Sequence, residues 1–187
     1  MFQSFEVATR PEDGPPRLAR LRDVMAAEGL AGFLVPRADA HQGEYVAPCD
    51  ERLAWLTGFT GSAGFAAILS DVAGVFVDGR YRVQIKAQVA SAFSPVDWPE
   101  TKLGPWLIDH LPQGGEVGFD PWLHTRSEMK GLVRALAGTD VLLRPVTNLV
   151  DRVWPDRPAP PSGKAMAHPI ELAGKKSGEK REEIAKG

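Results

Sequence analysis

Residues 18–35, LARLRDVMAAEGLAGFLV, decide the fold class of this chain. The first part predicts an amphipathic helix that ends at Gly29, because glycine is a natural helix terminus. The apolar residues at helical spacing are Leu18, Leu21, Val24 and Met25. The next run, Ala31–Val35, is short, apolar and bounded by Gly and Pro, as is typical of a buried strand. A helix that leads directly into a buried strand predicts an α/β layer structure.

The remaining chain continues this alternation of helices and strands. Phe65–Leu69 and Gly74–Val77 predict a β-hairpin, because a polar Ser-Asp turn separates two apolar runs. Further strands are expected at Glu116–Phe119 and Val141–Leu143, and helices at Tyr81–Val89, Leu103–Leu111, Ser127–Leu136 and from Asn148 to Trp154. The helix at Ser127–Leu136 is expected to bury one face, made of Met129, Leu132, Val133 and Leu136.

Composition divides the chain into four parts. Residues 1–15 are a polar, flexible lead-in, and residues 16–154 form the folded domain. Residues 155–165 are a proline-rich linker, since such runs are extended and mark domain boundaries. Residues 166–187 hold few large apolar side chains and cannot bury a core alone. We expect them to be the truncated start of a second domain, so that the chain is a fragment.

Charge and cysteine content narrow the classes of partner. Lys plus Arg number 22 and Asp plus Glu 24, a net charge of −2 that predicts neither nucleic acid nor an anionic membrane as partner. The single cysteine allows no intrachain disulfide, which fits a reducing compartment. The chain lacks a signal-peptide pattern and an apolar run of the ~20 residues that a membrane span needs. These features predict a soluble, cytoplasmic protein.

The segment Asp39–Gly64, DAHQGEYVAPCDERLAWLTGFTGSAG, has no clean helical or strand period and is expected to be a site-bearing loop. His41 has acidic neighbours, but a single local imidazole does not favour a metal site. Cys49 adjoins Asp50, which raises a thiol pKa, so a semi-buried, inert cysteine is expected. The glycines lack the P-loop ending and precede a strand, so they indicate tight turns or close packing rather than phosphate binding.

A second signal, Val77-Asp78-Gly79-Arg80-Tyr81, follows an apolar strand. Arg80 there is either a surface ion-pair partner or a guanidinium that binds a carboxylate or carbonyl bidentately. The residues alone leave both interpretations open.

The Asp39–Gly64 segment together with FVDGRYRVQ (Phe76–Gln84) resembles the N-terminal domain of aminopeptidase P, the cytosolic, three-domain type within the creatinase/prolidase metallopeptidase family. Further matching motifs lie at Val117–Pro121, Pro145-Val146, Asn148–Asp151, Trp154 and Asp156–Pro158. The resemblance extends from about residue 17 to residue 160. It implies a three-layer α/β domain with a mixed sheet of about six strands, the ribonuclease H-like creatinase N-terminal fold. It also implies a second domain whose first helix begins near Gly178.

The resemblance also implies a function for the parent enzyme. Members of the family release the N-terminal residue from peptides with proline in second position, using two divalent metals, typically manganese. The metal ligands belong to a C-terminal domain, so no catalytic residue, metal ligand or cofactor is expected in this chain, and the chain alone is expected to be inactive. Arg80 is the implied substrate-binding residue, and His41 and Tyr45 are expected to line the same cleft. The implied partners are short peptides, the second and catalytic domains, and optionally a second copy in a homodimer.

One position departs from the resemblance. Family members tend to carry Ser before the Ala-Asp or Gly-Asp pair of the first loop, where this chain has Arg37. Two alternatives remain: a prolidase- or creatinase-type relative, and a stand-alone peptide-binding module.

Overall fold

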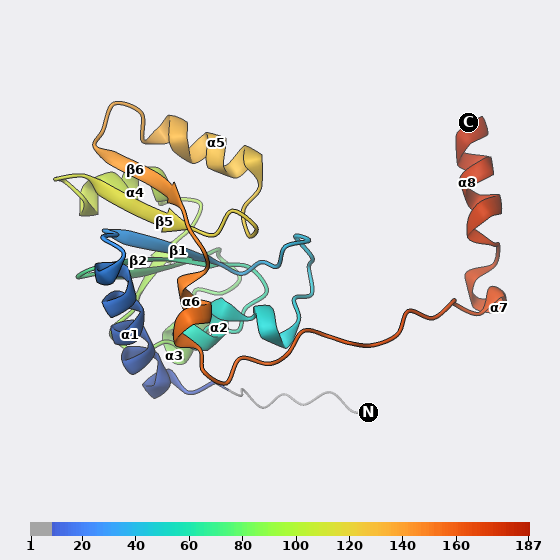
Figure 1. Cartoon of the computed structure of the whole chain (residues 1–187), viewed down its shortest axis with the longest axis horizontal. Helices are drawn as coiled ribbons and strands as arrows, with labels where there is room; N and C mark the ends of the chain where they lie inside the picture. Colours follow the sequence, from blue (N-terminus) through green and yellow to red (C-terminus); the bar gives the residue numbers. More distant parts are fainter. Residues whose placement is uncertain (1–8) are drawn as a thin grey trace.

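The computed structural model describes residues 9–187 and shows a six-stranded sheet with helices on both faces (Figure 1). The strands are β1 Gly32–Pro36, β2 Phe65–Leu69, β3 Ala73–Val77, β4 Ser94–Asp97, β5 Gly115–Phe119 and β6 Val141–Pro145. Their order across the sheet is β4-β3-β2-β1-β5-β6. β2 pairs antiparallel with both neighbours, whereas the other pairs are parallel. The carboxyl ends of five strands therefore meet at one edge of the sheet.

The helices form two layers on this sheet (Figure 1). Their bounds are α1 Gly14–Ala27, α2 Arg52–Thr57, α3 Gln84–Gln88, α4 Leu103–His110, α5 Arg126–Ala135, α6 Leu149–Val153, α7 Ile170–Ala173 and α8 Ser177–Lys186. Two 3-10 turns, η1 Pro11–Asp13 and η2 Pro48–Asp50, precede α1 and α2. α1, α2 and α6 cover one face, and α4 and α5 cover the other. The predicted three-layer α/β fold with a mixed, six-stranded sheet is confirmed.

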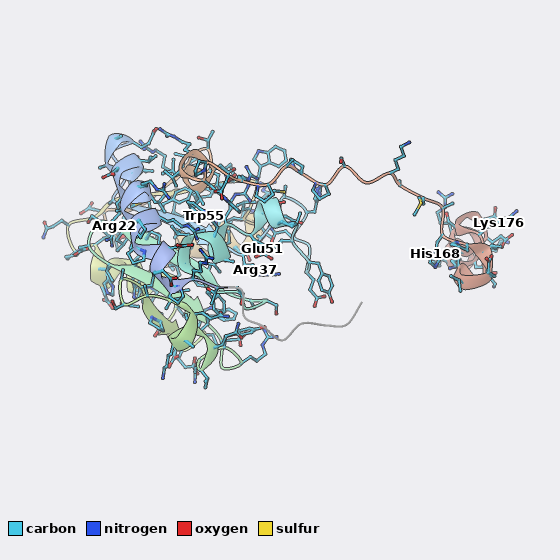
Figure 2. The ribbon with its side chains drawn as sticks, turned by 90° about the horizontal axis from the view of Figure 1, so that it is seen from below. Arg22, Arg37, Glu51, Trp55, His168 and Lys176 are labelled. Atoms are coloured by element: carbon cyan, nitrogen blue, oxygen red, sulfur yellow. The ribbon has the colours of Figure 1, made fainter. Side chains whose placement is uncertain are left out.

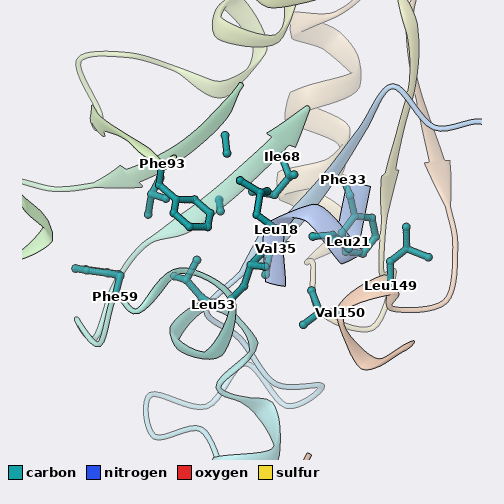
Figure 3. Close-up of a cluster of buried hydrophobic side chains, with 14 of the residues drawn as sticks. Leu18, Leu21, Phe33, Val35, Leu53, Phe59, Ile68, Phe93, Leu149 and Val150 are labelled. Carbon is teal, nitrogen blue, oxygen red and sulfur yellow. The ribbon is translucent and has the colours of Figure 1, made fainter. Parts of the chain in front are cut away.

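Two hydrophobic clusters lie on opposite faces of the sheet, and the residues of β1 alternate between them. Phe33 and Val35 join the cluster beneath α1, α2 and α6 (Figure 3), whereas Leu34 joins the cluster beneath α4. This alternation follows from the two-residue period of a strand. Because both faces of β1 are covered, the strand reads as a continuous apolar run, as parallel-sheet strands do.

The helix termini carry the expected capping residues. Gly29 follows α1 with φ of 68°, a left-handed conformation that favours glycine. The Thr125 hydroxyl and the Glu128 side chain form a capping box at the start of α5. The side chain of Asn148 accepts a hydrogen bond from the Val150 amide and caps α6, which confirms the helix predicted to start there.

Several details differ from the sequence prediction. The segment predicted as one loop, Asp39–Gly64, contains η2 and α2. The helix predicted over Tyr81–Val89 is shortened to α3, because residues 80–83 form a turn. β4 was not predicted; it is an exposed edge strand, where Pro95 and polar residues are tolerated. Val133 of α5 is exposed rather than buried.

The two ends of the described chain differ in structure from the central domain or from the sequence prediction. Residues 1–8 of the predicted lead-in lie outside the described residues, whereas residues 11–15 form η1 and the start of α1 rather than a flexible segment. After Arg157 the chain leaves the domain as an extended segment and reaches α7 and α8 (Figure 1). α8 begins at Ser177, beside the predicted start near Gly178. Within residues 9–187, no helix combines the length and the apolar character that crossing a bilayer requires.

Candidate functional site

The two sequence motifs lie at the same edge of the sheet. The Asp39–Gly64 segment connects the carboxyl end of β1 to the amino end of β2, and Asp78–Tyr81 follows the carboxyl end of β3. Ligands of α/β proteins bind preferentially outside the carboxyl ends of strands. The topology therefore places both motifs where a binding site is expected.

Arg80 is exposed and held in position by one carboxylate. Its side chain is 65% exposed, while that of Asp78 is 18% exposed. The Nε atom of Arg80 donates to both Asp78 oxygens (3.1 and 3.2 Å), and Nη2 donates to Oδ2 (2.7 Å). The Arg80 amide also donates to Asp78 Oδ1 at 2.9 Å. These bonds lower the pKa of Asp78, with the Arg80 side chain as the largest cause. Among residues 9–187, Nη1 of Arg80 has no hydrogen-bond partner and remains free for a ligand.

Tyr81 joins this motif to the glycine-rich part of the long segment. Its hydroxyl lies 2.5 Å from the Ser62 hydroxyl, and its ring packs edge-on against Phe59. A Cβ at Gly61 would lie 2.8 Å from the Tyr81 ring and closer still to Phe59. Close packing therefore requires glycine at position 61, in line with the packing role that the sequence indicated.

His41 and Tyr45 lie on the first part of the segment. The Asp39 carboxylate accepts hydrogen bonds from the backbone amides of His41 and Gly43, both at 2.9 Å. The bond from Gly43 is the largest cause of the lowered pKa of Asp39. Tyr45 is 88% exposed. Within the described chain, no hydrogen bond or ion pair joins His41 or Tyr45 to Arg80. The structure thus places all three residues on loops at one edge of the sheet without direct contact between them.

Arg37 connects the two ends of the long segment, a role that the sequence did not indicate. Its Nη1 atom donates to the carbonyl oxygens of Glu44 (3.0 Å) and Ser62 (3.1 Å), and Nη2 reaches the Glu51 carboxylate at 3.4 Å (Figure 2). Burial raises the pKa of Glu51, although the charge of Arg37 opposes this shift. The only sequence signal for this residue was that Arg37 replaces a more usual serine.

Four charged residues form a cluster of ion pairs, which joins Asp50 and Arg52 of the long segment to Asp151 and Arg157. Arg52, whose side chain is 6% exposed, donates to both oxygens of Asp151 (2.6 and 3.1 Å) and to Asp50 (2.9 Å). Arg157 pairs with Asp151 (2.7 Å) and donates to the Cys49 carbonyl (2.7 Å). The cluster joins α2, α6 and the first linker residues. Cys49 is buried rather than semi-buried, and burial followed by the hydrogen bond to Asp50 raises its pKa, the direction expected from its acidic neighbour.

The long segment borders a groove, and its potential metal ligands are dispersed in the part of the chain that the structure describes. Among residues 9–187, no three His, Cys, Asp or Glu side chains are grouped so that they could hold a metal ion. A groove of about 880 Å³ runs beside α2 and is lined in part by Glu51, Trp55 and Thr60. Arg80, His41 and Tyr45 do not line it. This edge of the sheet thus presents the oriented, exposed guanidinium of Arg80 and the exposed side chain of Tyr45.

Comparison with known proteins places this domain in a family. The model of the creatinase/prolidase N-terminal domain matches residues 17–153. The chain belongs to this family, and the predicted resemblance to the N-terminal domain of aminopeptidase P is confirmed.

The chain is similar to a probable Xaa-Pro aminopeptidase P of Coccidioides posadasii (strain C735), with 40% identity over 97% of this chain and 29% of the relative. Its counterpart in Ajellomyces dermatitidis is 39% identical over 94% of this chain and 29% of the relative. Among solved structures, the X-prolyl aminopeptidase of Caenorhabditis elegans, described as a cytosolic enzyme with a di-nuclear active site, matches with a TM-score of 0.80. That match has 29% identity and covers 90% of this chain and 30% of that one. The N-terminal domain of the cytoplasmic peptidase PepQ from Mycobacterium tuberculosis matches with a TM-score of 0.58 and 25% identity, over 74% of this chain and 98% of that one.

The chain spans just under a third of the length of these curated relatives. Its relatives are aminopeptidases, and their names link its family to peptide hydrolysis. The family model matches residues 17–153, whereas the similarity to these relatives extends over 94–97% of the chain.

Proposed function

We propose that this chain is the non-catalytic N-terminal domain of a cytoplasmic Xaa-Pro aminopeptidase, which releases the first residue from peptides with proline in second position. The names of the relatives at about 40% identity support this substrate class. The cytosolic description of the worm enzyme supports the location. The two metals, manganese by family resemblance, would belong to the catalytic domain, and the di-nuclear site of the worm enzyme is consistent with a metal pair. The partners would be short peptides and the enzyme's own second and catalytic domains.

The observation that carries the role of this domain is the oriented, exposed guanidinium of Arg80. Asp78 bonds to Nε and Nη2 of an Arg80 side chain that is 65% exposed, and among residues 9–187 Nη1 makes no hydrogen bond. An arginine fixed in this way can donate to a carbonyl or carboxylate at a lower entropic cost, because its side chain is already ordered before the ligand binds. Arg80 would hold the distal part of the peptide across the gap between domains, and His41 and Tyr45 would line the same cleft.

The rival assignments receive less support. A stand-alone peptide-binding module does not account for similarity that continues through the linker to 97% of the chain. A prolidase- or creatinase-type relative agrees with the family but not with the aminopeptidase names of the relatives. A homodimer stays a prediction.

The test is the Arg80→Ala variant of the complete aminopeptidase, assayed with a Xaa-Pro peptide and Mn²⁺. We expect KM to rise by roughly tenfold, as for loss of one charge-assisted hydrogen bond, with an unchanged melting temperature. Arg82→Ala is the matched control, because Arg82 is a neighbouring arginine that pairs with Asp97 and Glu100 instead. The 187-residue chain alone serves as the blank and should give no turnover. Unchanged KM and kcat in Arg80→Ala would show that Arg80 is only structural.

A further inference from the structure

Arg37 makes hydrogen bonds to two parts of the long segment that are distant in sequence. Its Nη1 atom reaches the Glu44 carbonyl and the Ser62 carbonyl, which lie 7 and 25 residues away along the chain. Within residues 9–187, no other hydrogen bond joins residues 39–47 to residues 58–64. The Arg37 guanidinium, only 13% exposed, is therefore the polar connection between these two stretches.

Each stretch leads directly to a candidate site residue. Glu44 precedes Tyr45, so a bond to its carbonyl fixes the backbone from which Tyr45 projects. Ser62 bonds through its hydroxyl to Tyr81, and the Arg80 guanidinium lies 5.1 Å from the Tyr81 ring. The Arg37 side chain is thus connected to Tyr45 through the Glu44 backbone, and to Tyr81 and Arg80 through Ser62.

We propose that Arg37 is a positioning residue, which holds the Tyr45 segment and the Tyr81–Arg80 turn in one fixed arrangement. The proposal rests on the proposed function, since it assumes that these two elements meet the peptide. The guanidinium suits this role because its planar fork presents several donors in a fixed geometry, and Nη2 donates to the Glu51 carboxylate at 3.4 Å.

The first test measures amide hydrogen exchange in the chain itself, in Arg37→Gln. The reporters are the Gly43 amide, bonded to Asp39, and the Tyr81 amide, bonded to the Asp78 carbonyl. We expect both to exchange roughly tenfold faster, as for loss of about one hydrogen bond of local stability. The matched control is Arg22→Gln, which removes an arginine bond to the Leu69 carbonyl at the opposite edge of the sheet (Figure 2). Exchange that is unchanged at either reporter, or equally fast in the control, would overturn the proposal.

The second test measures kinetics in the complete aminopeptidase, because a merely structural residue would alter stability without a specific effect on KM. In Arg37→Gln we expect KM to rise by roughly tenfold while kcat stays within about twofold. In the Arg80→Ala background the same change should raise KM by less, because residues that act through one another are not additive. Unchanged KM in Arg37→Gln, alongside an Arg80→Ala variant that binds poorly, would refute the role of Arg37 and leave the proposed function intact. A raised KM in Arg37→Gln with a normal Arg80→Ala variant would refute the role of Arg80 and assign the effect to the Tyr45 segment.

Discussion

Replacing Arg52 by Met tests whether the charged cluster holds α2, α6 and the linker together. The change keeps most of the side-chain volume but removes three hydrogen bonds, two to Asp151 and one to Asp50. Burial alone would lower the pKa of Arg52, but the hydrogen bonds and charge of Asp151 outweigh it and raise the pKa above its ordinary value. The cation is therefore stabilised by partners that would be left behind in the variant.

The expected cost follows from how well those partners can be rehydrated. Removing one member of a buried ion pair costs about 3–5 kcal/mol. The carboxylates of Asp50 and Asp151 are 23% and 27% exposed, and Arg157 still contacts both. We therefore expect the lower end, about 3 kcal/mol, which corresponds to a fall of roughly 6–12 °C in melting temperature for a domain of this size.

Urea unfolding followed by circular dichroism measures this loss as a lower midpoint at constant slope. The matched control is Arg152→Met, because Arg152 on α6 makes an exposed pair with Glu28 that should be worth under about 1 kcal/mol. The double variant Arg52→Met, Asp151→Leu should recover part of the loss, since Asp50 is then the one carboxylate of the two that still faces the removed cation. A cost for Arg52→Met no larger than that of Arg152→Met would refute the reasoning.

Two further predictions concern a glycine and a histidine. Gly58→Ala should destabilise the domain by roughly 2 kcal/mol or more, because φ is +86° and the new Cβ would lie 2.4 Å from the Gln88 carbonyl oxygen. Gly138→Ala, at φ +84° in open space, measures the backbone cost alone, and equal unfolding free energies for the two variants would contradict the clash. Burial lowers the pKa of His124, so the unfolded state binds the extra proton first as the pH falls below about 6.5. The stabilising contribution of neutral His124 is thus present above that pH and lost below it. His124→Phe should flatten the decline in unfolding free energy between pH 7 and pH 5, and an identical decline in the variant would exclude His124 as its source.

The sequence was informative where local pattern and burial agree. β1 and the β2–β3 hairpin are apolar runs between turn residues, and burial on both faces of the sheet is what makes them so. β4 escaped prediction because Ser94, Pro95 and Asp97 are exposed and only Val96 packs against a hydrophobic cluster, so the strand shows no apolar run. α2 escaped because a helix of six residues is too short to show a period.

The candidate site divides in the same way. Arg80 could be singled out because it follows a strand end within a motif, and its geometry depends on Asp78 only two residues away. Arg37 and Arg52 could not be assigned their contacts, because these depend on how distant segments fold together. Arg52 and Asp151, for example, are 99 residues apart in sequence.

The ion pairs of Arg157 with Asp50 and Asp151 fix the start of the linker on the domain, and this limits how far α7 can lie from the domain. The residues of the linker from Pro158 to Pro169 are the only free tether between this fixed point and α7. A fully extended tether of that length spans roughly 40 Å. Ile170, the first residue of α7, therefore lies within roughly that distance of Arg157 in any arrangement of the linker.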